Sequence, residues 1–212
     1  MDPEALLLAA EGLIAAEGLD ATSIRAIAKR AGCDPALIYY HFDSKVALFS
    51  ALLTRRLDPL EQELARLSRP DGRPLPVRLW EVLGVYRSRF QTDGGFRSLM
   101  RNEMLRGAEE TRTLIGESVR RNAQHLWSIF EQGLASGEIR PGQDPRLLGF
   151  FFARFYMELL EMMPVFCARV ARLENDPQAL PMAERAWFDL FWRGVGTDPE
   201  AGARHLATLE AL

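Results

Sequence analysis

Apolar residues recur along this chain at the spacing of a helix. Leu6, Ala10 and Ile14 stand four positions apart near its start, which places them on one helical face. The same period returns through most of the chain, whereas the sustained alternation of apolar and polar residues that marks strands is nearly absent. The pattern therefore predicts an all-α protein with about nine to ten helices.

Candidate caps and breakers set the expected boundaries of these helices. The expected ranges are 3–17, 24–31, 35–42, 44–67, 78–90, 96–105, 110–135, 145–173 and 181–195, with a short helix after Pro199. Pro59 interrupts the fourth range, and an internal proline costs about 3 kcal/mol. We expect this helix either to bend at Pro59 or to be two helices. The proline-rich and glycine-containing residues 68–76 form the densest loop signal and a plausible boundary between functional parts.

Residues 22–49 carry the most specific local pattern. A short helix that ends at Gly32 is followed by Asp34-Pro35, a cap and a first residue suited to the next helix. Three rings with polar tips in that next helix stand outside the core-facing positions: Tyr39, Tyr40 and His41. The pattern therefore predicts two helices joined by a tight turn, with rings available for a partner.

Composition is that of an ordinary globular protein with one local basic segment. The 212 residues are 48% apolar and 26% charged, and the net charge of −3 argues against indiscriminate coating of nucleic acid. Positive charge gathers between residues 22 and 45, at Arg25, Lys29, Arg30 and Lys45. Cys33 and Cys167 lie far apart and are expected to be reduced. With neither a basic leader nor a long apolar run, we expect a cytoplasmic protein that does not cross a membrane.

The sequence lacks the residue sets that catalysis or a structural metal requires. His41, His125 and His205 are too far apart to share a helix turn, and no cysteine or acidic residue accompanies them at ligand spacing. The glutamates stand on polar helix faces, and there is no glycine-rich phosphate loop or nucleophile elbow. We therefore expect a protein that is not an enzyme and uses no cofactor and no metal.

Residues 22–49 read Thr-Ser-Ile-Arg-x-Ile-Ala-x-x-Ala-Gly-Cys-x-x-x-x-Ile-Tyr-Tyr-His-Phe-x-Ser-Lys-x-x-Leu-Phe, and an apolar helix precedes them. This pattern closely resembles the DNA-binding domain of the tetracycline-repressor (TetR) family. One departure is Cys33, where the family usually has valine. The resemblance implies a helix-turn-helix DNA-binding domain in residues 1–50 and an effector-binding and dimerisation domain in residues 51–212. It further implies a homodimeric regulator, usually a repressor, that leaves a pseudo-palindromic double-stranded DNA operator when a small-molecule effector binds.

The resemblance also assigns roles to individual positions. The implied DNA-binding residues are Thr22, Ser23, Arg25, Pro35, Ala36, Leu37, Tyr39, Tyr40, His41 and Lys45. The proline, alanine and leucine of this set offer apolar contacts, so hydrogen-bonded base readout is expected mainly from Arg25 and Tyr39. Tyr40, His41 and Lys45 match positions that contact phosphates, and the amino end of the following helix is expected to bind a phosphate as well.

The larger domain is expected to hold both an effector site and a dimer interface. The expected ligand-binding residues are Trp80, Tyr86, Phe90, Met100, Met104, Trp127, Phe130 and Phe155. Few charges accompany them, which favours a hydrophobic or amphipathic effector. Four phenylalanines between residues 150 and 155 cannot share one side of a helix, so this helix is expected to contact more than its own neighbours. The expected interface residues are Phe151, Phe152, Leu159, Trp187, Leu190 and Phe191.

Two other classes of protein remain as alternatives. A helical ligand-binding or scaffold protein whose helix-turn-helix head no longer binds DNA would also explain the acidic first helix and the modest number of basic residues. An all-α enzyme would use the apolar region as its active site, but it would need an acid, a base or a metal set that the sequence does not offer.

Overall fold

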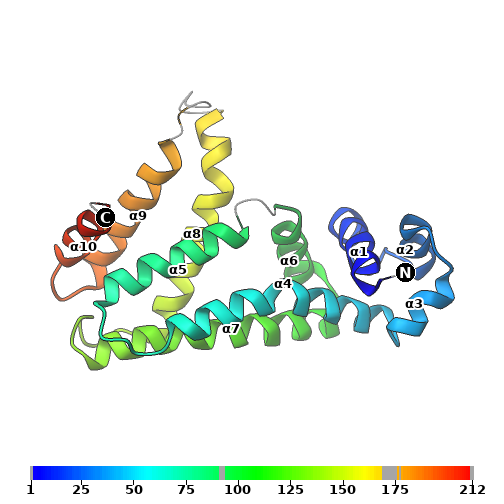
Figure 1. The fold of residues 1–212 in the computed structure, drawn as a ribbon, viewed down its shortest axis with the longest axis horizontal. Helices are drawn as coiled ribbons and strands as arrows, with labels where there is room; N and C mark the ends of the chain where they lie inside the picture. Colours follow the sequence, from blue (N-terminus) through cyan, green and yellow to red (C-terminus); the bar gives the residue numbers. More distant parts are fainter. Residues whose placement is uncertain (1, 91–93, 169–175, 177, 211–212) are drawn as a thin grey trace. The chain divides into compact units, whose positions relative to one another are not determined.

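The computed structural model of the protein describes residues 2–90, 94–168, 176 and 178–210 (Figure 1). Over these residues the chain is helical, and they contain no strand. Ile139 and Gly196 form an isolated antiparallel bridge between two loops. The prediction of an all-α fold is therefore confirmed. No helix in this part of the chain is long and apolar enough to cross a membrane.

Ten helices are present in the described part of the chain. They are α1 (Pro3–Glu17), α2 (Ile24–Ala31), α3 (Pro35–His41), α4 (Lys45–Leu67), α5 (Leu75–Phe90), α6 (Gly94–Arg106), α7 (Glu109–Ala135), α8 (Pro145–Phe166), α9 (Ala179–Val195) and α10 (Ala201–Glu210). Most boundaries agree with the sequence prediction to within a few residues. The helix expected to reach residue 173 ends as α8 at Phe166, and residues 169–175 lie outside the described part.

The chain forms two compact units. Unit 1 comprises Met1–Pro59 and Asp93–Arg121, and unit 2 comprises Leu60–Thr92 and Asn122–Leu212. Unit 1 therefore contains α1, α2, α3 and α6 with the first parts of α4 and α7, whereas unit 2 contains the remaining helices. These compact units differ from the functional division expected near residue 50, which stays a prediction.

The core of unit 1 follows from the apolar period of its helices. Leu6 and Ala10 on α1, Ile27 on α2 and Ile38 on α3 have no exposed surface. The first helix packs against both α2 and α6. Burying each of the larger side chains contributes about 1.5–3 kcal/mol, so this shared core holds the three short helices in one arrangement.

Three helices begin with the same pair of residues, an aspartate followed by a proline. In α1, α3 and α8, the side chains of Asp2, Asp34 and Asp144 each accept a hydrogen bond from the backbone amide two residues later. The proline that follows has no amide hydrogen to leave unpaired, and its fixed φ suits the first turn. Each of these helix starts is therefore set by local sequence.

The fourth helix passes through its internal proline. α4 is one helix from Lys45 to Leu67 with Pro59 inside it, so the alternative of two separate helices is wrong. The proline costs about 3 kcal/mol in a helix interior. Leu57, Leu60 and Leu64 around it are buried, at about 1.5–3 kcal/mol each, and their burial offsets that cost.

Aromatic side chains fill the centre of unit 2. Phe152 of α8 packs edge-on against Phe130 of α7, with ring centroids 5.7 Å apart, and also contacts Trp187 and Phe191 of α9. The rings of Trp187 and Phe191 are stacked at 5.5 Å. Such ring pairs contribute about 0.5–1.5 kcal/mol beyond their burial, so this cluster joins α7, α8 and α9.

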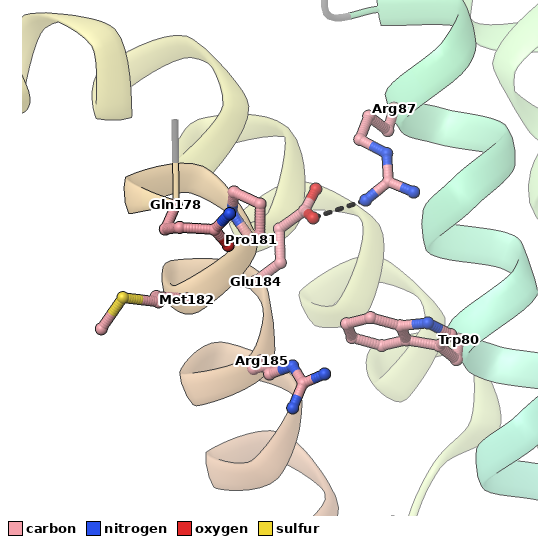
Figure 2. Close-up of a pocket in the computed structure, with 7 residues that line it drawn as sticks. All are labelled: Trp80, Arg87, Gln178, Pro181, Met182, Glu184 and Arg185. Carbon is pink, nitrogen blue, oxygen red and sulfur yellow. Dashed lines mark hydrogen bonds and ion pairs between the residues drawn. The ribbon is translucent and has the colours of Figure 1, made fainter. Parts of the chain in front are cut away.

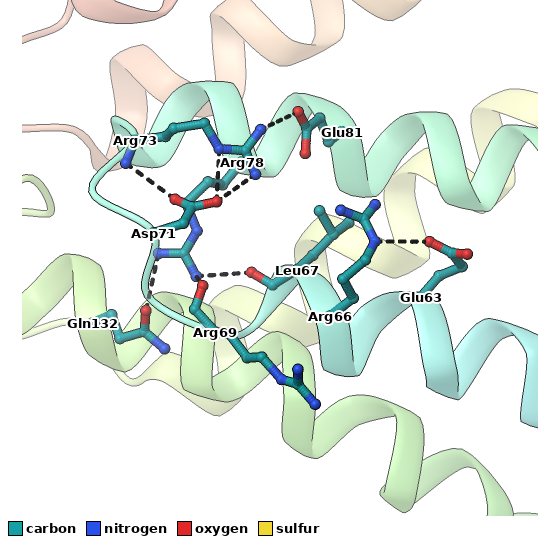
Figure 3. Close-up of polar contacts among 9 residues, drawn as sticks. All are labelled: Glu63, Arg66, Leu67, Arg69, Asp71, Arg73, Arg78, Glu81 and Gln132. Carbon is teal, nitrogen blue, oxygen red and sulfur yellow. Dashed lines mark hydrogen bonds and ion pairs between the residues drawn. The ribbon is translucent and has the colours of Figure 1, made fainter.

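A buried arginine holds the carboxyl end of α4 in unit 2 (Figure 3). Arg78 of α5 donates to the carbonyl oxygen of Leu67 at 2.8 Å and to Oε1 of Gln132 at 2.9 Å. Gln132 in turn donates to the carbonyl oxygen of Ser68 at 2.7 Å. The last carbonyls of a helix have no partner within it and carry partial negative charge. A cation and an amide therefore satisfy the end of α4 from two neighbouring helices.

Candidate nucleic-acid interface and ligand site

The turn between α2 and α3 has the local geometry of a tight helix-turn-helix. Ser23 caps α2 by accepting a hydrogen bond from the amide of Ala26 at 3.1 Å. Gly32 ends the helix with φ of 71°, a left-handed conformation that glycine adopts without strain. Asp34 then caps α3 by accepting from the amide of Ala36 at 2.7 Å. The sequence signals for this turn are therefore each observed as hydrogen bonds.

α3 buries one residue and exposes its rings. Ile38 has no exposed surface, whereas Tyr39 is 57% exposed and Tyr40 is 82% exposed. The ring of His41 lies edge-on to Tyr40 with centroids 5.1 Å apart. Large exposed rings on a short helix cost hydrophobic free energy unless a partner covers them. The expectation that these rings stand outside the core is confirmed, while their contacts to DNA stay predictions.

The surface near α3 is basic. Arg25, Lys29 and Arg30 of α2 are exposed. Arg30 also lies against α1, because a Cβ atom built on Gly12 would be 2.9 Å from a terminal guanidinium nitrogen of Arg30. The cations of α2 thus stand on the same small unit as the exposed rings of α3, which is an arrangement suited to phosphate and base contacts.

Lys45 and Thr22 have partners inside unit 1. The ammonium of Lys45 donates to the carbonyl oxygens of Leu19, Asp20 and Thr22, at 2.7, 3.2 and 3.1 Å. Thr22 is 1% exposed, and its hydroxyl donates to the carbonyl oxygen of Gly18 at 2.8 Å. A buried hydroxyl that is already bonded cannot reach a phosphate, so Thr22 is dropped from the interface. Lys45 holds the α1–α2 turn through these hydrogen bonds. Its contact with a DNA phosphate stays a prediction.

A carboxylate on α6 holds the same turn from another side. Glu103 is 5% exposed, and its Oε1 accepts a hydrogen bond from the amide of Leu19 at 2.8 Å. A Cβ atom on Gly107 would lie 2.8 Å from Oε2 of Glu103, so this glycine leaves the carboxylate its room. Sequence reasoning had placed Glu103 on a solvated helix face, and that interpretation is wrong. The contact joins residues 84 positions apart, which no local pattern reveals.

The side chains expected to line an effector site come from both units, and their role stays a prediction. Met100 and Met104 belong to unit 1, whereas the others belong to unit 2. Phe130 is fully buried in the aromatic core, and Tyr86 is also buried, which raises the pKa of its hydroxyl well above the ordinary value. Phe155 is 55% exposed and stacks on Phe151 along the outer side of α8. Of this predicted set, Trp80 lines a cavity described below.

Trp127 is partly buried and packs against α8, and the side chain of Phe90 lies outside the described part. A Cβ atom on Gly149 of α8 would lie 2.8 Å from the indole of Trp127, which shows how closely the ring approaches that helix. Trp127 therefore contributes to the packing of α7 against α8.

A cavity of about 370 Å³ lies between α5 and the first turns of α9 in unit 2 (Figure 2). It is lined by Trp80, Arg87, Gln178, Pro181, Met182, Glu184 and Arg185. Its volume falls in the range of about 300–1,000 Å³ that small-molecule sites occupy. Indole, proline and methionine surfaces thus share this cavity with two guanidinium groups and one carboxylate.

The carboxylate of Glu184 is buried and paired on both of its oxygens. Glu184 is 2% exposed, and Arg87 donates from Nη1 to its Oε2 at 2.5 Å. The hydroxyl of Tyr156, which is fully buried on α8, donates to Oε1. Burial and this bond to a carboxylate raise the pKa of Tyr156 far above its ordinary value, so the hydroxyl keeps its proton. Glu184, itself held by Tyr156, therefore fixes the guanidinium of Arg87 at the cavity.

The outer sides of α8 and α9 expose large apolar residues. On α8 these are Leu147, Phe150, Phe151, Phe155, Met162, Val165 and Phe166, and on α9 they are Met182 and Leu190. Of the expected interface residues, Phe151 and Leu190 are exposed, at 42% and 73%. Phe152 is fully buried within the single chain, so it cannot contact a partner subunit. Leu159, Trp187 and Phe191 are partly buried.

The fold and these surfaces define a helical protein with an N-terminal helix-turn-helix unit. Residues 6–52 match the family model described as bacterial regulatory proteins, tetR family. The amino-terminal part of the chain is therefore similar to the DNA-binding domain of the TetR family. The resemblance noted in residues 22–49 is therefore confirmed.

Two curated relatives are similar to part of the chain. The HTH-type transcriptional repressor BepR of Brucella suis biovar 1 (strain 1330) is 33% identical over 78 residues, which is 37% of this chain and 37% of that protein. The HTH-type transcriptional repressor BdcR of Escherichia coli (strain K12) is 34% identical over 93 residues, which is 44% of this chain and 47% of that protein. The match thus spans less than half the length of either relative.

The fold of nearly the whole chain is shared with a solved structure. The transcriptional regulator FadR from Bacillus subtilis, in complex with stearoyl-CoA, superposes with a TM-score of 0.67 at 20% sequence identity. The superposition covers 85% of this chain and 97% of that one. The fold of that structure therefore extends over most of this chain, well beyond the residues that the family model matches.

Proposed function

We propose that this protein is a sequence-specific DNA-binding transcriptional repressor that acts as a homodimer in the cytoplasm and leaves its operator when a small-molecule effector binds. The observation that carries the proposal is the exposed face of α3, with Tyr39 and Tyr40 beside the basic residues of α2. Both curated relatives are named repressors, and the family model matches residues 6–52, which contain this face. The family is one of regulators, so no enzymatic activity is expected.

The roles within the interface follow from the chemistry of each side chain. Arg25 is exposed and long enough to reach a base edge, where a bidentate guanine contact contributes about 1–3 kcal/mol of discrimination. Tyr39 offers a hydroxyl from the exposed side of α3, and Ala36 offers a methyl group to a thymine. Tyr40 and His41 are assigned to phosphates, which orient the protein without reading sequence.

The amino end of α4 is a further phosphate site in this proposal. Ser44 accepts a hydrogen bond from the amide of Ala47 at 3.0 Å, which leaves earlier amides of the first turn to other partners. The positive end of the helix dipole favours an anion there. Ser23 is exposed at the start of α2, although its hydroxyl oxygen already accepts from Ala26.

The proposed homodimer uses the outer sides of α8 and α9. α8 exposes seven large apolar residues, and the adjacent α9 exposes Met182 and Leu190; exposed apolar surface of this kind is typical of a protein–protein interface. A twofold axis would pair this surface with its own copy, as symmetric dimers do. Phe151 and Leu190 stay in the proposed interface, whereas Phe152 is left out because it is buried. A dimer would also present two α3 helices to the two halves of a pseudo-palindrome.

The proposal is tested by selecting double-stranded oligonucleotides from a random pool with the purified protein and sequencing them. We expect enrichment of a pseudo-palindrome whose half-sites are about one helical turn, roughly 34 Å, apart. Arg25→Ala should lose the preference at one position of each half-site. Arg66→Ala, an exposed α4 variant in unit 2, is the matched control and should select the wild-type sequence.

Failure to enrich any sequence would overturn the proposal. The protein would then be the alternative considered from the sequence, a helical ligand-binding or scaffold protein whose head does not bind DNA. An enriched sequence that Arg25→Ala selects equally well would keep the proposed function but refute the role given to that arginine.

A further inference from the structure

The cavity between α5 and α9 combines features that select the charge of a ligand. Arg87 is held by a carboxylate that is itself buried, and its side chain is 42% exposed. Within the described residues, Glu184 is the partner that the structure gives this guanidinium, through Nη1. A guanidinium has five N–H donors in a rigid fork. The remaining donors of Arg87 are therefore left for a ligand at a fixed place.

The lining carries charges of both signs. Arg87 is paired with the buried carboxylate of Glu184. Since Tyr156 keeps its proton and donates a hydrogen bond to Glu184, it adds no negative charge. A preformed arginine fork matches the two oxygens of a carboxylate and favours an anion over a neutral or cationic ligand.

The apolar side of the cavity is flat and fixed. In Figure 2, Trp80 lies below Arg87 and to the right of Arg185, and its ring packs edge-on against the buried Phe188 with centroids 5.3 Å apart. Pro181 and Met182 add apolar surface from the first turns of α9. An aromatic or short aliphatic body can therefore lie on the indole while its acidic group reaches the arginine.

We propose that this cavity binds a small carboxylic acid with a flat apolar body, with the carboxylate on Arg87 and the body on Trp80. The assignment deepens the proposed function by naming the effector class, and its regulatory meaning rests on that function. The volume of about 370 Å³ suits a ligand of one or two rings.

The test is isothermal titration calorimetry of the full chain without DNA, using 2-naphthoate and its neutral analogue 2-naphthalenemethanol. We expect 2-naphthoate to bind roughly tenfold or more tightly than the alcohol, because hydrogen bonds to charged groups are the stronger ones. Trp80→Leu should weaken both probes, since both use the indole. Equal affinity for the acid and the alcohol, or no binding of either, would overturn the proposal.

Variants of the arginine separate binding from folding. Arg87→Met should remove the preference for the acid, but it also leaves Glu184 buried without its cation and can unfold the protein. Arg87→Lys keeps the charge and should retain part of the preference while losing the fork. Arg89→Met, an exposed arginine on the same helix, is the matched control and should bind both probes as wild type does.

Ligand binding and DNA binding are measured apart, so their failures are distinguishable. If Arg87→Lys and Arg87→Met both fold and still prefer 2-naphthoate to the alcohol as strongly as wild type does, the proposed site is refuted. This holds whether or not the protein binds DNA. If the oligonucleotide selection fails while 2-naphthoate still binds through Arg87, the site stands and the repressor function falls. If both succeed, saturating 2-naphthoate should weaken operator affinity, which fluorescence anisotropy measures directly.

Discussion

Replacing Glu103 by methionine tests how the turn between α1 and α2 is held. The carboxylate is 5% exposed, and Leu19, whose amide it accepts at 2.8 Å, is 1% exposed. Methionine has a similar length and no strong acceptor, so it leaves that amide buried and unpaired. An unpaired buried donor costs about 1–3 kcal/mol. Glu103→Gln keeps a neutral acceptor and should cost less, about 0.5–1.5 kcal/mol.

Hydrogen exchange of the Leu19 amide reports this loss directly. If exchange occurs through opening of the turn, the rate should rise about tenfold for each 1.4 kcal/mol lost. Thermal unfolding gives a second measure, with a shift of about 2–4 °C per kcal/mol for a chain of this size. Glu110→Met, at an exposed position near the start of α7, is the control and should leave the amide unchanged. Equal exchange of the Leu19 amide in wild type and Glu103→Met would refute this account of the turn.

Three further outcomes follow from the structure. Lys45→Ala removes three hydrogen bonds to carbonyls and should lower the free energy of unfolding, measured in urea, by about 1–3 kcal/mol. If Lys45 only bound phosphate, the substitution would instead change only the salt dependence of DNA binding, by a slope of about 0.9 per contact. Leu190→Arg places a charge in the proposed interface and should halve the mass found by sedimentation equilibrium; an unchanged mass would exclude this face. The hydrogen bond from Arg146 lowers the pKa of Asp144 to about 2, from 3.8. The stability that the ionised Asp144 cap gives to α8 should therefore persist above about pH 4 and be lost as the pH falls toward 2. Asp144→Asn should not show this loss of helical signal in acid when circular dichroism is followed against pH.

Local signals allowed much of unit 1 to be predicted from the sequence. Gly32, Asp34 and Pro35 act on neighbours within a few residues, so their roles are readable without knowledge of the fold. Ile38 and Tyr39 were also assigned correctly to the inside and the outside of α3, because helical period alone separates them. For such short-range features, sequence and structure carry the same information.

Polar groups buried by distant partners were beyond sequence reasoning. Glu103 looks like a surface residue until α1 is placed beside α6, and Glu184 looks the same until Arg87 and Tyr156 approach it. The predicted effector residues stay a prediction, but their burial illustrates the same point. Sequence reasoning selected large apolar side chains such as Phe130, but the core uses these, and the cavity is lined partly by charged residues instead.

The aspartate–proline starts of α1, α3 and α8 bear on how the protein is made. A growing chain leaves the ribosome from its amino end at about 5–20 residues per second, and early segments cannot yet reach distant partners. Because each of these caps needs a partner only two residues ahead, the first turn of each helix can form as soon as it emerges. Unit 1, by contrast, waits for Glu103 to be synthesised before the α1–α2 turn gains its last hydrogen bond. The first turns of α1 and α3 can therefore form early in synthesis, but the α1–α2 turn gains its full set of hydrogen bonds only after about half of the chain has been made.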